Sequence, residues 1–162
     1  MLWNHKPLKY TTKVGDDLLS KILDVGSALL FVLGIISAFF GLYSTFLPSS
    51  VMLSNEDLLG MTVTELHNFS PKVVDYMELY HQLYGVYLIS FALSLWVISL
   101  IPYRKGEKWA WYATLVIGGI ALLGQLILAK KMVSITLSII LIILWIAGLA
   151  LPAKEILGKP SS

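Results

Sequence analysis

Four apolar stretches without a single formal charge constrain the fold of this chain more than any other feature. They cover residues 25–47, 83–101, 109–129 and 132–151. Each is close to the roughly 20 residues that a helix needs to cross a hydrocarbon core of about 30 Å. A segment in lipid must satisfy its own backbone hydrogen bonds, which a helix does. The sequence therefore predicts an all-α, polytopic membrane protein built as a bundle of four transmembrane helices.

The composition supports a membrane protein and excludes several classes of function. Hydrophobic residues make up 57% of the chain and charged residues 14%, whereas soluble domains carry about 25% charged residues. A net charge of +2 is too small for a nucleic-acid-binding surface, so we expect no nucleic acid as a partner. The absence of cysteine excludes disulfides, thiol catalysis and cysteine-ligated metals.

The distribution of lysine and arginine predicts the orientation, because short cytoplasmic loops are enriched in basic residues. One side would hold Lys6, Lys9, Lys13, Lys21, Arg104, Lys105, Lys108, Lys154 and Lys159, and the other only Lys72, Lys130 and Lys131. We therefore expect a cytoplasmic segment over residues 1–24, a membrane domain over 25–151 and a cytoplasmic tail over 152–162. Asp24, at the mouth of the first span, is expected to interact with the dipole of a helix start.

The outer connection, residues 48–82, is predicted to be short and helical. Ser54 can cap a short turn that stops at Gly60. Thr62 and Glu65 have the spacing of a capping box, which would start the next helix. The connection is acidic, so its surface should carry a negative charge.

Ser70 and Pro71 mark a further helix start, since proline at the first helical position loses no hydrogen bond. Nothing breaks this helix before Pro102, so we expect one helix that stands out of the membrane and continues into the second span. Its outer part should carry tyrosines on one face as interfacial anchors, namely Tyr76, Tyr80, Tyr84 and Tyr87. The alternative is a surface that binds a partner or a ligand.

The connection between the second and third spans is expected to be a hairpin that fixes topology. Pro102 would end the second helix, and Gly106 would allow a tight turn. The predicted anchors at the interface are Arg104, Lys105, Trp109 and Trp111. Specific binding of an anionic lipid is the alternative.

Within the spans, small and polar residues predict where helices pack closely. In the first span these are Gly34, Ala38 and Gly41, and in the third Ala110, Thr114, Gly118 and Gln125. Gln125 would hydrogen-bond to a neighbouring helix. No acidic, basic or histidine side chain lies at membrane depth, which argues against an ion-coupled pump.

The outer connection holds the only candidate metal ligands. Glu78 and His81 have the i, i+3 spacing found in di-iron helical bundles. Those sites need more ligands, which would have to come from Glu65, His67 or Asp75. Solvated side chains are the alternative that we favour, and we predict neither a cofactor nor a catalytic residue.

Part of the chain resembles a family of prokaryotic four-helix membrane proteins. The resemblance lies in Gly60-Met61-Thr62, Glu65-Leu66, Ser70-Pro71, Gly85 and the hairpin Arg104-Lys105-Gly106-Glu107-Lys108-Trp109-Ala110-Trp111-Tyr112. It implies four spans and a prokaryotic plasma membrane, and it carries no assigned activity. A weaker similarity to DoxX-like proteins rests on span number and size.

Three functions remain open. The leading hypothesis is a non-catalytic interaction protein, either an accessory subunit of a membrane complex or a self-associating protein. The alternative is a protein or permease that binds lipid or a small hydrophobic molecule among its helices. An enzyme that uses carboxylates and histidines of the outer connection is the third.

Overall fold

The computed structural model describes residues 9–54, 56–129 and 135–158, and the elements within them are all helical. They are α1 (Lys9–Phe46), α2 (Pro48–Leu53), α3 (Glu56–Leu59), α4 (Val63–Phe69), α5 (Pro71–Ile98), the π-helical turn η1 (Ser99–Tyr103), α6 (Lys108–Ala129) and α7 (Ile135–Leu157). Four helices are long and apolar enough to cross a membrane, over Ser20–Phe46, Pro71–Tyr103, Lys108–Ile127 and Ser138–Leu157. The predicted all-α fold with four transmembrane helices is confirmed.

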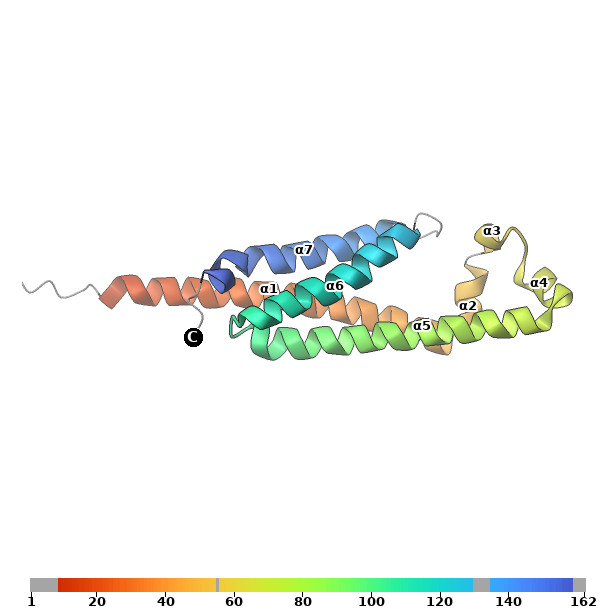
Figure 1. Cartoon of the computed structure of the whole chain (residues 1–162), viewed down its shortest axis with the longest axis horizontal. Coiled ribbons are helices and arrows are strands. Elements are labelled where there is room, and N and C mark those ends of the chain that lie inside the picture. The colour runs from red at the N-terminus through yellow and green to blue at the C-terminus, as the bar shows by residue number, and fades with distance from the viewer. Residues whose placement is uncertain (1–8, 55, 130–134, 159–162) are drawn as a thin grey trace, which may run out of the picture.

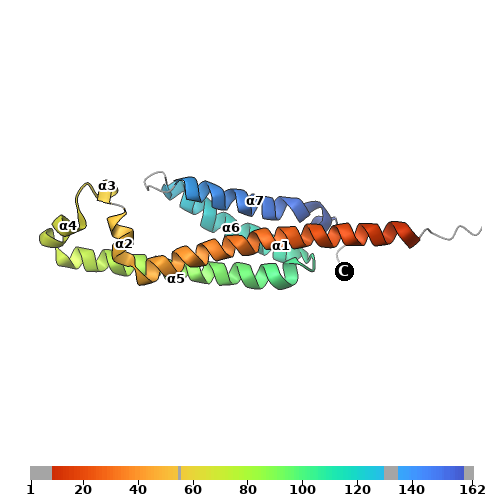
Figure 2. The ribbon, with the colours of Figure 1, turned by 180° about the vertical axis from the view of Figure 1, so that it is seen from behind.

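Helix α1 is the centre of the bundle. It packs along α5 on one side and α7 on the other, while α6 packs mainly against α7. Helices α5 and α6 approach each other chiefly through η1 at the hairpin (Figure 1). The start of α1, the end of α7 and this hairpin lie at one end of the molecule, and α2, α3 and α4 lie at the other (Figure 2).

The helices extend further than the apolar stretches alone predicted. Helix α1 begins at Lys9, so the predicted cytoplasmic segment is helical where the structure describes it. Helix α7 continues through Pro152 to Leu157, into the predicted tail. The beginning of the fourth predicted span, residues 132–134, lies outside the described residues.

The sequence predicts that Pro102 ends the second helix. In the structure, Pro102 lies inside η1 instead. Proline removes one backbone donor and its ring crowds the preceding turn. The wider π-helical turn accommodates that ring, and the chain reverses at Gly106, whose φ is +70°. The Gly106 N–H then donates to the Tyr103 carbonyl oxygen at 2.9 Å.

The outer connection is ordered by local hydrogen bonds. Thr62 and Glu65 form the predicted capping box of α4, and Gly60, with a φ of +68°, follows α3 as predicted. Ser54, predicted to cap α3, instead lies at the end of α2, and its hydroxyl donates to the Val51 carbonyl. A small core of Met52, Leu66 and Val74 joins α2 and α4 to the outer part of α5.

Candidate functional site

Glycines set the contact between α1 and α5. A methyl group added at Gly85 would lie 2.5 Å from the Gly41 carbonyl oxygen, and one added at Gly41 would lie 2.8 Å from the Gly85 oxygen. The two backbones therefore touch at this point. Gly34 lies under the Trp96 indole, and Ala38, between the two α1 glycines, is half-buried.

The predicted row of small residues on α6 lies against α7. Ala110 and Thr114 are fully buried, and Gly118 lies under the Trp145 indole, whose Cδ1 would be 2.6 Å from an added methyl group. Gln125 is half-buried, and it forms no hydrogen bond with any residue that the structure describes. The interhelical hydrogen bond expected for the Gln125 side chain is therefore not found among the described residues.

Aromatic donors connect the helices through backbone carbonyls, a feature that sequence reasoning missed. Trp96 Nε1 donates to the Phe31 oxygen at 3.2 Å, which joins α5 to α1. Trp145 Nε1 donates to the Thr114 oxygen at 3.1 Å, and Trp111 Nε1 to the Leu149 oxygen at 3.0 Å, so α6 and α7 are joined twice. The need of a buried indole N–H for a partner was the available signal.

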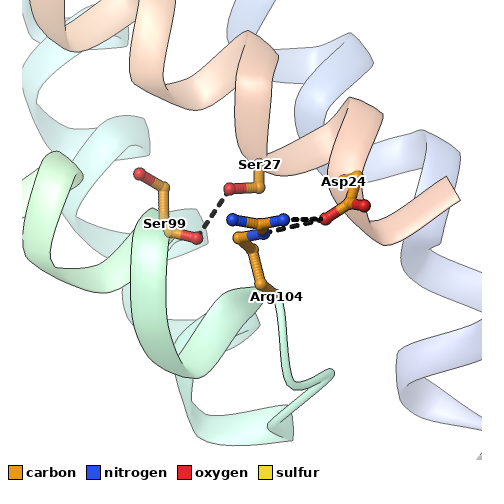
Figure 3. A network of polar contacts seen from close by, with 4 residues as sticks. All are labelled: Asp24, Ser27, Ser99 and Arg104. Atoms are coloured by element: carbon orange, nitrogen blue, oxygen red, sulfur yellow. Dashed lines mark hydrogen bonds and ion pairs between the residues drawn. The ribbon is translucent and has the colours of Figure 1, made fainter. Parts of the chain in front are cut away.

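The hairpin end carries a polar network between α1 and the end of the second span (Figure 3). Arg104 donates from Nε at 2.8 Å and from Nη2 at 2.6 Å to the same carboxylate oxygen, Asp24 Oδ1. One turn along α1, the buried Ser27 hydroxyl donates to the Ser99 carbonyl at 2.7 Å. Asp24 is thus an ion-pair partner inside α1, and the predicted interaction with a helix start is wrong because α1 begins at Lys9.

An open pocket of about 250 Å³ adjoins this network. Its lining residues are Asp24, Ser27, Ala28, Phe31, Leu100 and Arg104. The two charged side chains are each 50% exposed, so the pocket opens to the surroundings of the bundle. It combines a charged rim with an apolar wall.

The other predicted hairpin anchors differ in their surroundings. Lys105 is exposed, and Trp109 is exposed with its indole N–H donating to the Glu107 carboxylate. Trp111 is half-buried, and its hydrogen bond to α7 makes it part of the bundle as well as of the hairpin.

The tyrosines of α5 lie on its exposed side. Tyr76 and Tyr80 are 69% and 59% exposed, Tyr87 is also exposed, and Tyr84 is less so, at 38%. The opposite side of this outer part is covered by α2 and α4, where Val74 is buried and Glu78 accepts a hydrogen bond from the Ser49 hydroxyl at 2.6 Å.

The candidate metal ligands do not assemble. Glu65 is engaged by Thr62, Glu78 by Ser49, and the His81 ring meets Tyr80 edge-on. His67 is exposed on α4. Across the described ranges, no three histidine, aspartate or glutamate side chains are grouped to hold a metal ion.

Glu65 is the acidic group of the outer connection whose ionisation the fold favours. The Thr62 backbone N–H donates to Glu65 Oε2 at 2.8 Å and the Thr62 hydroxyl at 2.9 Å. The backbone hydrogen bond, followed by the hydroxyl, lowers the pKa of this carboxyl because both favour its charged form.

Comparisons of this chain with protein-family models, with curated proteins and with solved structures found no match. The resemblance to prokaryotic four-helix membrane proteins therefore stays a prediction.

Proposed function

We propose that this protein is a non-catalytic subunit of a membrane complex, which binds a transmembrane helix of another protein along α5. The supporting observation is a continuous row of exposed side chains at alternating spacings of three and four residues. The row consists of Val73, Tyr76, Tyr80, Leu83, Tyr87, Ser90, Ser94 and Val97 of α5, followed by Ile101 of η1. We call it the α5 row. This 3.5-residue period is the spacing at which one helix packs along another.

The α5 row faces away from α1. Val74, Gly85, Ala92 and Leu95 are buried on the other side of α5 against the rest of the protein. The row is therefore free to contact a further helix. At its middle, Ser90 and Ser94 donate their hydroxyls to the carbonyls of Val86 and Ser90 within α5. Small side chains that are already satisfied allow two membrane helices to approach closely.

The length of the second span favours a partner with a part outside the bilayer. Pro71–Tyr103 comprises 33 residues, about 50 Å at 1.5 Å per residue, whereas the hydrocarbon core is about 30 Å thick. With the charged hairpin at the interface, about a dozen residues at the start of α5 stand outside the core. Exposed Tyr76 and Tyr80 in that part are typical of protein interfaces.

The charge around the outer part of the row indicates the chemistry of the partner. Exposed Asp75 lies next to Tyr76 on α5, and the neighbouring outer connection and the covered side of α5 add Glu56, Glu65 and Glu78, so that acidic residues outnumber Lys72 at this end of the molecule. We expect the partner to present a transmembrane helix whose outer extension is rimmed by lysine or arginine.

Crosslinking tests this proposal, because the chain has no cysteine of its own. Tyr80→Cys and Ser94→Cys would carry a thiol-attached photocrosslinker in native membranes. Ile120→Cys, exposed on α6, is the matched control. We expect crosslinked products of the same added mass from both α5 positions and none from Ile120→Cys. The proposal also predicts that Asp75→Lys lowers the yield of the crosslinked product at Tyr80→Cys.

Two results would overturn the assignment. A photocrosslinked product of twice the mass of this chain from Tyr80→Cys and from Ser94→Cys would mean that α5 binds a second copy of this chain. Equal yields from α5 and α6, or lipid adducts only, would mean that the α5 row faces bulk lipid.

A further inference from the structure

We propose that the pocket between α1 and the hairpin is a binding site for a phospholipid whose headgroup carries both a phosphate and a primary amine, that is, a phosphatidylethanolamine. The site lies at the end of the bundle opposite α2, α3 and α4, and it is independent of the α5 row (Figures 1 and 3).

The ion pair leaves one group of each sign available at the pocket. Both donors of Arg104 converge on Asp24 Oδ1. Among the described residues, neither Asp24 Oδ2 nor Arg104 Nη1 has a partner. The carboxylate oxygen can accept from an ammonium group, and the guanidinium nitrogen can donate to a phosphate.

The Ser27 hydroxyl in the floor of the pocket donates its hydrogen to the Ser99 carbonyl, so it is not a donor that competes with Arg104 for a phosphate. The remaining wall is apolar, with Phe31 and Leu100 lying within the candidate spans and the ion pair at their end. Phe31 lies seven residues along α1 from Asp24, about 10 Å deeper into the membrane at 1.5 Å per residue. A lipid bound here would place its headgroup on the ion pair and an acyl chain along Phe31 and Leu100.

The charges distinguish this lipid from the other common ones. Asp24 and Arg104 together are neutral, so a lipid with an anionic headgroup would leave the site with a net negative charge beside the Asp24 carboxylate. A choline headgroup has no N–H to donate to Asp24 Oδ2. An ethanolamine headgroup satisfies both open groups and keeps the site neutral.

The test is native mass spectrometry of the whole protein released from nanodiscs containing equal parts of phosphatidylethanolamine, phosphatidylcholine and phosphatidylglycerol. We expect the amine lipid to be retained about threefold over choline lipid, the size of one half-exposed charged hydrogen bond. Asp24→Asn should abolish this preference. Asp17→Asn, which alters an exposed ion pair with Lys21 on the same helix, should leave it unchanged.

A second variant addresses the possibility that Asp24→Asn disturbs the bundle. Ala28→Phe fills the pocket from an exposed position and leaves the ion pair intact. It should lower the retention of phosphatidylethanolamine to that of the other lipids while the thermal stability in detergent stays unchanged. Equal retention of the three lipids by the unaltered protein, or a preference that survives both Asp24→Asn and Ala28→Phe, would overturn the proposal.

Discussion

Tyr103 donates its hydroxyl hydrogen to the Gly148 carbonyl oxygen at 2.6 Å, and this is the carbonyl that Pro152 leaves without its helical partner. In an α-helix the carbonyl of residue 148 would accept from the N–H of residue 152, and proline has none. Tyr103 is fully buried, and Pro152 packs beside Gly26 of α1. The Tyr103 side chain thus supplies the hydrogen bond that the Gly148 carbonyl lacks within α7, and it joins the second span to the fourth.

We predict that Tyr103→Phe lowers the free energy of unfolding by about 1–2 kcal/mol, because a buried carbonyl is left unsatisfied. Unfolding by denaturing detergent in mixed micelles would measure the change. The specific control is Pro152→Ala, which restores an N–H for the Gly148 carbonyl. The cost of Tyr103→Phe should fall by at least half in the Pro152→Ala background, and an unchanged cost would contradict this explanation.

A matched pair of glycines on α6 tests the contact with Trp145. Gly118→Ala should destabilise the protein by about 1–3 kcal/mol, since the added methyl group collides with the indole and displaces its hydrogen bond to Thr114. At Gly119 the nearest atoms of Trp145 would be 3.6 Å from the methyl group, an ordinary contact. Gly119→Ala should therefore be neutral or stabilising by up to about 1 kcal/mol. Similar losses for both variants in the same unfolding assay would contradict the contact.

Gly85→Ala should be more damaging than Gly118→Ala. The atoms in its way include the Gly41 carbonyl oxygen and the Thr45 backbone nitrogen, which cannot rotate aside as an indole can. We expect a loss of about 3 kcal/mol or more, through separation of α1 from α5. Gly124→Ala, with open space around the added methyl group, is the control. A change in the distance between spin labels on α1 and α5 for Gly85→Ala alone would locate the effect.

The capping box predicts an acid-sensitive start of α4. Because the folded state lowers the pKa of Glu65 from its ordinary value of 4.5, its contribution is present above pH 4.5 and is lost as the pH falls through the lower, folded-state pKa. The protection factors of the Leu66 and His67 amides, that is, the exchange rate of an unstructured amide at the same pH divided by the observed rate, should fall over that range. Glu65→Gln should remove most of this pH dependence, while Asp75→Asn, outside the capping box, should preserve it. Protection factors that stay constant over that range in the unaltered protein would count against the Glu65 contribution.

Local sequence patterns correctly predicted where α4 and α5 begin, but not the positions of Ser54 and Pro102 relative to the helix ends. The capping box of Thr62 and Glu65 and the start at Pro71 depend on residues within one turn of each other, so the sequence contains all of their determinants. The prediction for Ser54 is wrong because a serine between two short helices can either end the first or start the second. The sequence predicts a helix end at Pro102 because the position of a proline does not distinguish an end from a π-helical turn.

The candidate sites were only partly accessible to sequence reasoning. Gly34, Gly41 and Gly118 could be expected at close contacts because small residues in spans have few other roles. Which side chain covers each one depends on where two helices cross, and nothing in the sequence predicted Trp96 or Trp145. Gln125 illustrates the converse: its polarity predicts an interhelical hydrogen bond, but it forms none with the residues that the structure describes.

The sequence by itself determined that this chain has four transmembrane helices, because the length of an apolar stretch is compared directly with the thickness of a bilayer. The tertiary structure alone decided that Asp24 pairs with Arg104, 80 residues away, and that Tyr103 reaches Gly148, 45 residues away. Such contacts depend on the order, depth and rotation of packed helices, and the periodicity of any one helix contains none of these. The exposed α5 row combines both, since its spacing can be read in the sequence but its exposure follows only from α1 packing on the other side.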